Sequence, residues 1–376
     1  MTRAVGGGDL QRLRRLNALA VVSALREAGP LPLTRLAERT ELARATIKEV
    51  IRDLVAVGWV AESGPHTGGG KGRPARHYRF RAENGRVLGI DIGAHKVAVA
   101  VADLDGEVQH FHREPVTPEH TRRERLDAVD RAVDACLAAT GTAPAEVWAT
   151  TAGSTGYVDG EGNIVVSRAI RDWSGTPLAD HLGRRLAGTV VVENDSRLAA
   201  LAECRRGVAR DVRDIVYLHI GRRAGAAVVL DGVPLRGSTG AAGEIGVHPL
   251  FHLADSTDLL VAGDSGRALF DAARRGDGQA LNAVLRYVKV LAMATAAMTL
   301  TVDPEVIVLG GGFSRSADVL MPPLRAELEA MCLRTPELRA SALGDECVAL
   351  GAVCHAVEHL DQRFFNPETG PLAPLG

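Results

Sequence analysis

Two stretches of the chain follow one design, RVLGIDIGAHKVAVAVADLDGEVQHFHREPV at residues 86–116 and DIVYLHIGRRAGAAVVLDGVPLRG at residues 214–237. Each begins with an apolar run, turns at a glycine, continues as a run of small and β-branched residues, and reaches an Asp-Gly turn. Gly93 precedes the first Asp-Gly turn by 12 residues, and Gly221 precedes the second by 10. The pattern predicts one strand unit used twice, and therefore an α/β fold with two lobes.

Length and composition are typical of a globular protein of two or three domains, with 376 residues, 46% apolar and 24% charged. The five cysteines are scattered without a C-x-C or C-x-x-C pair, which indicates buried thiols in a reducing cytoplasm. The longest apolar run, Val290 to Val302, is too short to cross a bilayer and suits a buried helix. We therefore expect a cytoplasmic protein without membrane contact.

The net charge of −2 conceals two parts of opposite sign. Residues 1–82 carry 15 Lys and Arg against 7 Asp and Glu, a net charge of +8, and the rest of the chain carries −10. A small basic domain therefore precedes a larger acidic one.

The basic domain has the spacing of a helix-turn-helix. Two amphipathic segments, Thr34–Arg39 and about 44–57, are joined by Thr40-Glu41-Leu42. The second segment would be a recognition helix, with these residues turned to solvent and able to reach base edges: Arg44, Thr46, Lys48, Glu49 and Arg52. A plain solvated helix face is the alternative. Ala43 stands where Ser or Thr would normally cap the helix, so we expect a frayed start.

A hairpin wing is expected after this helix, with strands at 59–62 and 76–81 around the sequence SGPHTGGGKGRPA. The wing would add Lys71, Arg73 and Arg76 to the DNA-binding residues. An arginine on a slim glycine-rich backbone suits a narrow, A·T-rich minor groove. The loop could also be a mere linker, but the basic charge and the helix-turn-helix together favour double-stranded DNA as the partner.

Three further segments carry a family resemblance, VVVENDSRLAALAE at 190–203, GSTGAAGEIG at 237–246 and VDPEVIVLGGG at 302–312. With the two strand units they resemble the ROK family (repressor, open reading frame, kinase). The resemblance implies a winged helix-turn-helix at 1–82 followed by an actin-like, sugar-kinase ATPase fold. Its first lobe would span 87–195 with a returning helix near 355–364, its second lobe and oligomerisation surface 196–354, and its tail 365–376 would be disordered.

The resemblance also implies a sugar site. Asn194 and Asp195 match the family's sugar-binding Asn-Asp pair, in which the Asp is the base of active kinases, although a plain helix cap is the alternative role. Glu244 matches a ligand of sugar hydroxyls. The family's next ligand is a His where this chain has Val247, so His248 would point to the opposite face of an extended segment and is a doubtful substitute.

The matching nucleotide residues are expected to be vestigial: Asp91, Gly93, Lys96, Gly221, Gly310 and Gly311. The family's second phosphate turn, Gly-Thr-Gly, is Gly221-Arg222-Arg223 here, which adds a Cβ where the backbone should approach phosphate. Arginine side chains could instead clamp phosphate, which is the counter-interpretation. The family's zinc-binding cysteines are absent from FHLADSTDLLVAGDSG at 251–266, and His248 and His252 alone cannot complete a tetrahedral site. We expect no zinc, no ATP and no Mg²⁺.

The resemblance and the basic helix-turn-helix together predict a ROK-type transcriptional regulator without kinase activity. We expect it to act as a repressor. It would bind an inverted-repeat operator as a homodimer or homotetramer and respond to a sugar or sugar-derived effector. An active ATP-dependent sugar kinase with a DNA-binding head is the competing interpretation. A regulator that responds to a protein or to a metabolite other than a sugar is the third.

Overall fold

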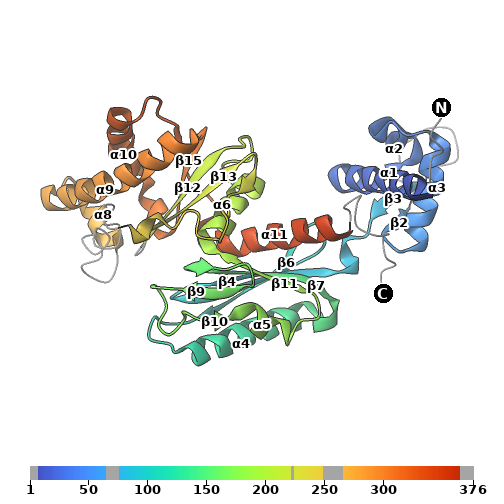
Figure 1. Ribbon diagram of the computed structural model, residues 1–376, viewed down its shortest axis with the longest axis horizontal. Coiled ribbons are helices and arrows are strands. Elements are labelled where there is room, and N and C mark those ends of the chain that lie inside the picture. Colours follow the sequence, from blue (N-terminus) through green and yellow to red (C-terminus); the bar gives the residue numbers. More distant parts are fainter. Residues whose placement is uncertain (1–6, 65–75, 222–223, 249–265, 365–376) are drawn as a thin grey trace. The chain divides into compact units, whose positions relative to one another are not determined.

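A computed structural model describes residues 7–64, 76–221, 224–248 and 266–364 (Figure 1). The chain divides into two compact units. The first unit consists of Met1–Val87, Ala102–Val108 and Val357–Gly376, and the second of Leu88–Val101 and Gln109–Ala356. The predicted disordered tail lies outside the described residues.

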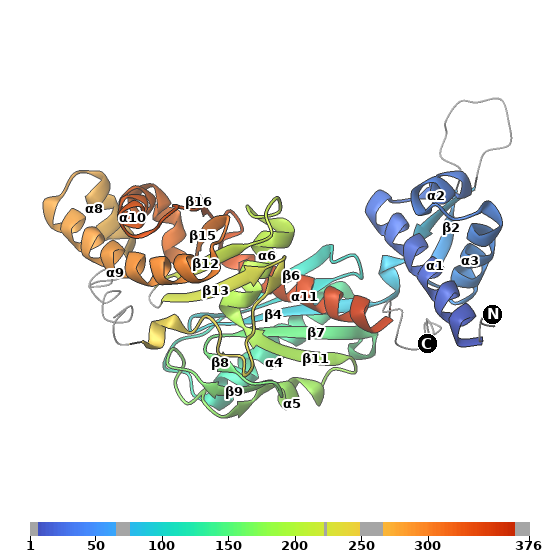
Figure 2. The same cartoon turned by 45° about the horizontal axis from the view of Figure 1, so that its top comes forward.

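The N-terminal part of the first unit is a winged helix-turn-helix, as predicted (Figure 2). Its elements are α1 (Gly7–Ala28), β1 (Leu31–Pro32), α2 (Leu33–Thr40), α3 (Arg44–Ala56), β2 (Val60–Ser63) and β3 (His77–Phe80). Leu36, Ile47 and Ile51 are buried, because their helical spacing gives each helix one apolar face. The strands form an antiparallel sheet of order β1-β3-β2, and Trp59 stacks on Phe80 with ring centroids 6.0 Å apart.

The first large sheet has the strand order β11-β7-β4-β5-β6. Its strands are β4 (Arg86–Ile92), β5 (Lys96–Ala102), β6 (Val108–Pro115), β7 (Val147–Ser154) and β11 (Thr189–Asn194). It is accompanied by α4 (Arg122–Thr140), α5 (Leu178–Gly183), η1 (Ala82–Asn84), η2 (Pro144–Glu146) and a small sheet of β8 (Tyr157–Val158), β9 (Asn163–Val166) and β10 (Thr176–Pro177). Val99, Val129 and Trp173 belong to its buried core. The parallel pairing of β11 with β7 sets Asn194 beside Ser154 at the carboxyl ends of both strands.

The second large sheet repeats this design with the order β14-β13-β12-β15-β16. Its strands are β12 (Ile215–Ile220), β13 (Ala224–Leu230), β14 (Val233–Pro234), β15 (Val306–Gly310) and β16 (Glu337–Ala340). Its other elements are η3 (Ile245–Val247), α8 (Gly266–Arg274), α9 (Gly278–Val302), η5 (Gly312–Ser316), α10 (Ala317–Met331) and η6 (Gly344–Glu346). The predicted duplication is confirmed, since strands β4 and β12 hold the same place in their sheets. The lobe boundaries stay a prediction.

Two helices, α6 (Asp195–Arg206) and α11 (Cys347–Phe364), pack closely together. A Cβ at Gly351 would overlap the carbonyl oxygen of Leu198, and a Cβ at Gly89 of strand β4 would overlap that of Ala349. Glycine is therefore required at both positions for the backbones to approach. This packing fixes α6, whose first residues carry the predicted sugar site.

Helix α9 is long and apolar enough to cross a membrane by length and composition alone. Its most apolar window is 61% buried inside the protein, where Tyr287, Leu291 and Ala292 contact the second sheet's core. The apolar run at 290–302 thus belongs to a core helix, as predicted.

Candidate functional site

Asn194 ends β11 and caps the N-terminus of α6. Its Oδ1 accepts hydrogen bonds from the backbone N–H groups of Ser196 at 2.9 Å and Arg197 at 3.2 Å. Its Nδ2 donates to the carbonyl of Gly156 at 3.0 Å and to Oε1 of Glu244 at 3.1 Å. The buried side chain of Asn194 therefore caps the helix and is also one of the predicted sugar ligands.

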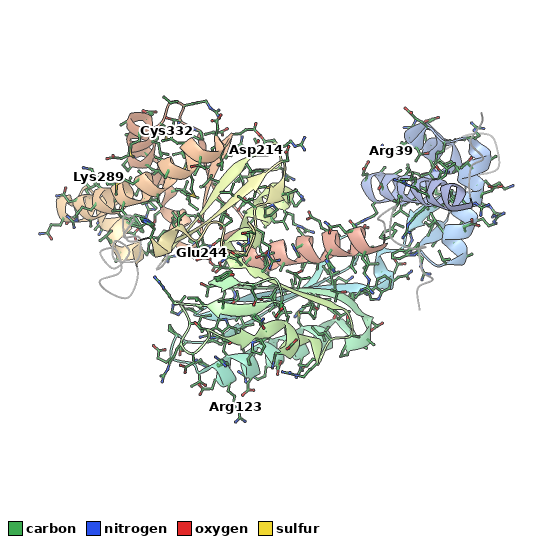
Figure 3. All side chains as sticks on the ribbon, viewed as in Figure 1. Arg39, Arg123, Asp214, Glu244, Lys289 and Cys332 are labelled. Carbon is green, nitrogen blue, oxygen red and sulfur yellow. The ribbon has the colours of Figure 1, made fainter. Side chains whose placement is uncertain are left out.

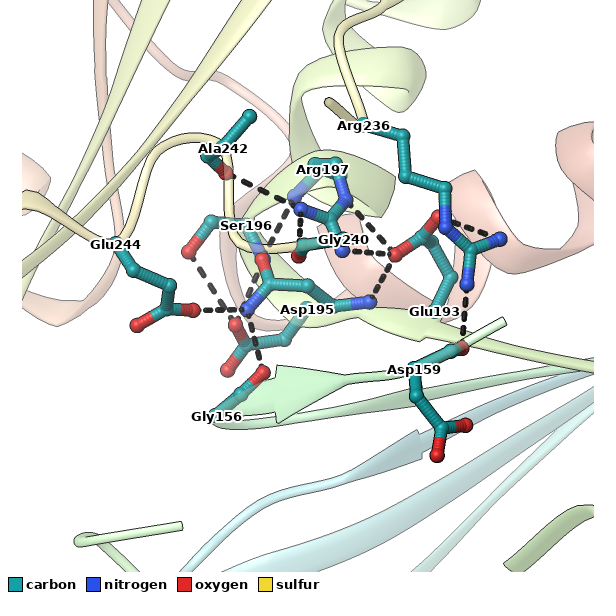
Figure 4. A network of polar contacts seen from close by, with 11 residues as sticks. Gly156, Asp159, Glu193, Asp195, Ser196, Arg197, Arg236, Gly240, Ala242 and Glu244 are labelled. Carbon is teal, nitrogen blue, oxygen red and sulfur yellow. Dashed lines mark hydrogen bonds and ion pairs between the residues drawn. The ribbon is translucent and has the colours of Figure 1, made fainter. Parts of the chain in front are cut away.

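Asp195 is the first residue of α6 and is half-buried. Its Oδ1 accepts from the backbone N–H of Ser196 at 2.7 Å and from the hydroxyl of Ser196 at 3.2 Å (Figure 4). A carboxylate at this end of a helix is favoured by the helix dipole. The arrangement presents a charged acceptor beside the amide of Asn194.

Glu244 joins this pair from the loop before η3. Burial raises the pKa of its carboxyl group and the neighbouring Asp195 raises it further, while Arg197 and Arg168 lower it. The structure thus brings together Asn194, Asp195 and Glu244, three of the four predicted sugar ligands. His248 is exposed at the end of η3. The ligand roles of all four residues stay predictions.

A buried ion pair beneath this site was missed by the sequence interpretation. Arg197 is 1% exposed and donates from Nε and Nη2 to Oε1 of Glu193, at 2.8 and 2.5 Å. Its Nη1 donates to the carbonyls of Gly240 and Ala242, at 2.9 and 3.1 Å, so it also holds the loop that leads to Glu244 (Figure 4). The signal in the sequence was an arginine on the apolar face of a helix, four residues after a glutamate.

Arg236 extends the same network. Its Nη2 donates to the carbonyl of Asp159 at 2.5 Å, and its Nη1 lies 3.9 Å from Oε2 of Glu193. Glu193 also accepts the backbone N–H of Asn194 at 2.6 Å. The site is therefore supported by charged groups that satisfy one another, which fixes its geometry before any ligand arrives.

The predicted nucleotide residues lie at or next to the ends of strands β4, β5, β12 and β15. Asp91, at the end of β4, is buried, and its Oδ2 lies 2.7 Å from Nζ of Lys96, which also donates to the carbonyl of Asp345. Burial raises the pKa of Asp91, and Lys96 opposes that rise. The carbonyl of Gly93 accepts from the buried Arg125 at 2.5 Å. The N–H of Gly93 donates to the carbonyl of Lys96 at 2.9 Å, so both backbone groups of Gly93 are engaged within the protein.

Packing explains the glycines at the end of β15. A Cβ at Gly310 would overlap the hydroxyl of Tyr217, and Gly311 has a φ of 82°, in the left-handed region that favours glycine. Both residues are required by the strand-to-helix turn whatever it binds. Gly221 precedes Arg222 and Arg223, which lie outside the described residues.

Within the described part of the chain, no three or more His, Cys, Asp or Glu side chains lie together in a way that could hold a metal ion. Residues 249–265, which include His252, lie outside it. The predicted lack of zinc therefore stays a prediction.

The predicted DNA-binding face is exposed on α3. Arg44, Lys48, Glu49 and Arg52 are exposed and Thr46 is partly so, while Ala43 provides no side-chain cap, as expected. Arg52 pairs with its neighbour Asp53, and Arg76 pairs with Glu62 across the wing, both at 3.1 Å. Within the described residues, neither Arg44 nor Lys48 forms an ion pair. Lys71 and Arg73 lie outside the described residues.

Comparisons with known proteins find matches to both the helix-turn-helix and the larger domain that follows it. The ROK family model matches residues 87–257 and 261–358, and the IclR helix-turn-helix model matches residues 16–64. The DNA-binding transcriptional dual regulator NagC of Escherichia coli is 26% identical, over 89% of this chain and 88% of its own. A glucokinase of Thermotoga maritima is 29% identical, over 71% of this chain and 96% of its own.

A solved structure of a ROK family transcriptional regulator, a homologue of the E. coli MLC protein, superimposes with a TM-score of 0.71. It is 22% identical and covers 92% of this chain and 97% of its own. The two regulators therefore cover about nine-tenths of the chain, whereas the glucokinase covers a smaller share of it.

Proposed function

This chain belongs to the ROK family, and we propose that it is a sequence-specific DNA-binding transcriptional regulator that represses its target genes and responds to a sugar or sugar-derived effector. The observation that carries the proposal is the winged helix-turn-helix with an exposed recognition helix. Arg44 and Lys48 are not engaged by ion pairs within the described residues, so they are available to an external partner. Cations in that position suit phosphates and the guanine edge.

The experiment is a selection of bound duplexes from a random library, followed by binding titrations of the selected sequence. We expect one recurring inverted repeat and a steep loss of affinity with salt. Arg44→Ala should weaken binding, while Arg123→Ala, which removes an equal charge from the exposed surface of α4, should not (Figure 3). Enrichment of no sequence would contradict the proposal.

The effector would bind at Asn194, Asp195 and Glu244. The amide of Asn194, which is hydrogen-bonded to Glu244, and the nearby carboxyl group of Asp195 suit the neighbouring hydroxyl groups of a sugar, which both donate and accept. The buried pair of Glu193 and Arg197 would hold these groups in place. An effector acts on DNA binding only through a difference in its affinity for two arrangements of the protein.

Kinase activity is the second candidate function, and one observation favours it. Asp195 stands at the start of α6 with Asn194 and Glu244, the placement that the resemblance gives to a catalytic base. Against it, Lys96 is engaged by Asp91 and Asp345, and the turn at Gly93 presents a carbonyl to Arg125. These contacts support the proposal that the protein does not transfer phosphate.

A coupled ATPase assay over a panel of hexoses tests this point. We expect no sugar-dependent turnover. Turnover that Asp195→Asn abolishes would establish the kinase instead.

We further propose a cytoplasmic homodimer or homotetramer, because an inverted repeat is matched by a protein with a two-fold axis.

A further inference from the structure

Arg26, near the end of α1, makes an unusually complete set of contacts inside the first unit. Its Nε donates to Oδ1 of Asp105 at 2.9 Å, its Nη1 to Oδ1 of Asp361 at 2.7 Å, and its Nη2 to the carbonyl of Leu104 at 2.9 Å. Its guanidinium carbon lies 5.4 Å from the centre of the Phe80 ring. The side chain is only 20% exposed. A planar guanidinium can bond in several directions at once, which a lysine cannot do.

The partners of Arg26 come from separate segments of the chain. Asp105 and Leu104 lie in the turn between β5 and β6, Asp361 lies in the last turns of α11, and Phe80 ends β3 of the wing. The side chain of Asp103 closes this turn, because its Oδ1 accepts the backbone N–H groups of Asp105 and Glu107, both at 3.0 Å. One side chain thus joins the DNA-binding head to two segments of the ROK domain that belong to the same compact unit.

The carboxyl groups of Asp105 and Asp361 both accept hydrogen bonds from Arg26. Burial raises the pKa of both Asp105 and Asp361, and Arg26 opposes the rise in each case. The neighbouring acidic groups of Glu358 and Asp105 also raise the pKa of Asp361. Without the guanidinium, two partly desolvated like charges would face each other, so removal of Arg26 should separate the segments rather than leave them loosely in place.

Helix α11 contributes residues to both compact units. Its first turns pack on α6, where Gly351 touches Leu198 and the thiol of Cys347 donates to the carbonyl of Ala199 at 3.4 Å. The same helix α6 begins with Asp195, next to Asn194. Helix α11 thus contacts α6 through its first turns, and its last turns carry Asp361, which Arg26 holds.

We propose that Arg26 is a positioning residue, which fixes the DNA-binding head on the last turns of α11 and so sets the spacing between half-sites that the protein accepts. The proposal rests on the proposed function for its DNA readout. Removing a positioning residue should affect DNA binding differently from simply destabilising the head. A released head should still bind one half-site, but it should lose its preference for a particular spacing.

The DNA experiment uses the inverted repeat that the wild-type protein selects, a single half-site, and repeats with the spacer lengthened by up to about 5 base pairs, roughly half a helical turn. For the wild type we expect a steep loss of affinity with the longer spacers. Arg26→Ala should bind the single half-site like the wild type and reduce the discrimination between spacers by about tenfold, the effect of about 1.4 kcal/mol. Arg26→Lys should fall near Arg26→Ala, because it keeps the charge without the three bonds.

Arg39→Ala is the matched control. Arg39 also lies in the head and pairs with Glu27, but the pair is exposed and stays within the head. Its loss should leave the spacing preference unchanged. An equal change in both variants would mean that charge alone is responsible, and would overturn the proposal.

Hydrogen exchange of the DNA-free protein gives an independent readout. Arg26→Ala should accelerate exchange at 102–108 and in the last turns of α11, while α2 and α3 stay protected as in the wild type. Loss of protection throughout the head would mean that Arg26 has a purely structural role. Unchanged exchange would mean that Arg26 does not hold these segments together. Either result overturns the proposal. If the wild type selects no duplex, the proposed function fails, and exchange alone decides whether Arg26 holds these segments.

Discussion

The starts of helices α3 and α6 are built in opposite ways. Helix α3 begins after Ala43, which has no capping side chain, and its first residue, Arg44, is exposed. Helix α6 begins after Asn194, whose side chain accepts two backbone N–H groups, and its Arg197 is 1% exposed and bonded on every side. The backbone donors and exposed cations at the start of α3 are therefore available to an external partner. The corresponding groups at the start of α6 bond within the protein and hold a site together.

The difference has a physical basis in the partner that each helix would meet. DNA supplies many phosphates, so an uncapped helix end and unpaired arginines find acceptors on binding. A small hydroxyl-rich ligand supplies few groups, so its site must be ordered in advance, or the ligand's binding energy is spent on ordering the protein. The following predictions test this contrast, from the largest expected effect to the smallest.

Arg197→Ala should lower the free energy of unfolding by about 3–5 kcal/mol, because it removes the close partner of the buried Glu193 and leaves it with Arg236 at 3.9 Å. Urea unfolding measures the loss. Arg123→Ala, at a position 92% exposed, should stay within about 0.5 kcal/mol of the wild type. A loss below about 1 kcal/mol for Arg197→Ala would mean that the network is not what holds the start of α6.

Arg44→Ala should leave stability almost unchanged and cost about 1–3 kcal/mol of discrimination at one base pair of the operator. The measurement is a set of titrations with operators substituted one base pair at a time. Uniform weakening at all positions would show that Arg44 contacts phosphate. A marked loss of stability would contradict the contrast between the two helices.

Ala43→Ser should stabilise the free protein by about 1 kcal/mol, because the new hydroxyl can accept one of the N–H groups at the start of α3. Thermal unfolding without DNA measures the gain. DNA affinity should rise by less than this, since phosphates would already order the helix start in the complex. No gain in melting temperature would mean that the start of α3 is not frayed.

Glu244→Gln should give the smallest effect, and one that depends on pH. The folded pKa of Glu244 is raised, mainly by burial, so its contribution to stability is fully present below its unfolded pKa and is lost as the pH rises through the folded pKa. The variant should therefore match the wild type in acid and be slightly more stable near neutral pH. Melting temperatures at several pH values test this, and identical curves at every pH would contradict it.

Local patterns predicted most of the fold. The apolar spacing of Ile47, Ile51 and Leu54 placed the recognition helix within one residue of its observed end, and the paired Asp-Gly turns located both hairpins. The second hairpin is less regular than its sequence suggests, because β14 is only Val233–Pro234. Proline cannot donate a hydrogen bond to a neighbouring strand, so the strand ends there.

The polar network was less predictable. Glu193 and Arg197 have the spacing of an ordinary exposed helix pair, but both are buried, and Arg197 also donates to the loop that carries Gly240 and Ala242. Family resemblance supplied Asn194, Asp195 and Glu244, but it gave no reason for the arginine between them. Burial depends on what packs against a residue, which its own neighbours in the chain do not reveal.

The sequence by itself determined the winged helix-turn-helix, the duplicated strand units, the uncapped start of α3 and the family. Each follows from spacing or residue type within a short window. The tertiary structure alone decided which charges meet: Arg197 with the loop at 240–242, and Arg26 with Asp361, a residue 335 positions away in the chain. Such pairs form because packing brings distant segments together and burial penalises any charge left without a partner.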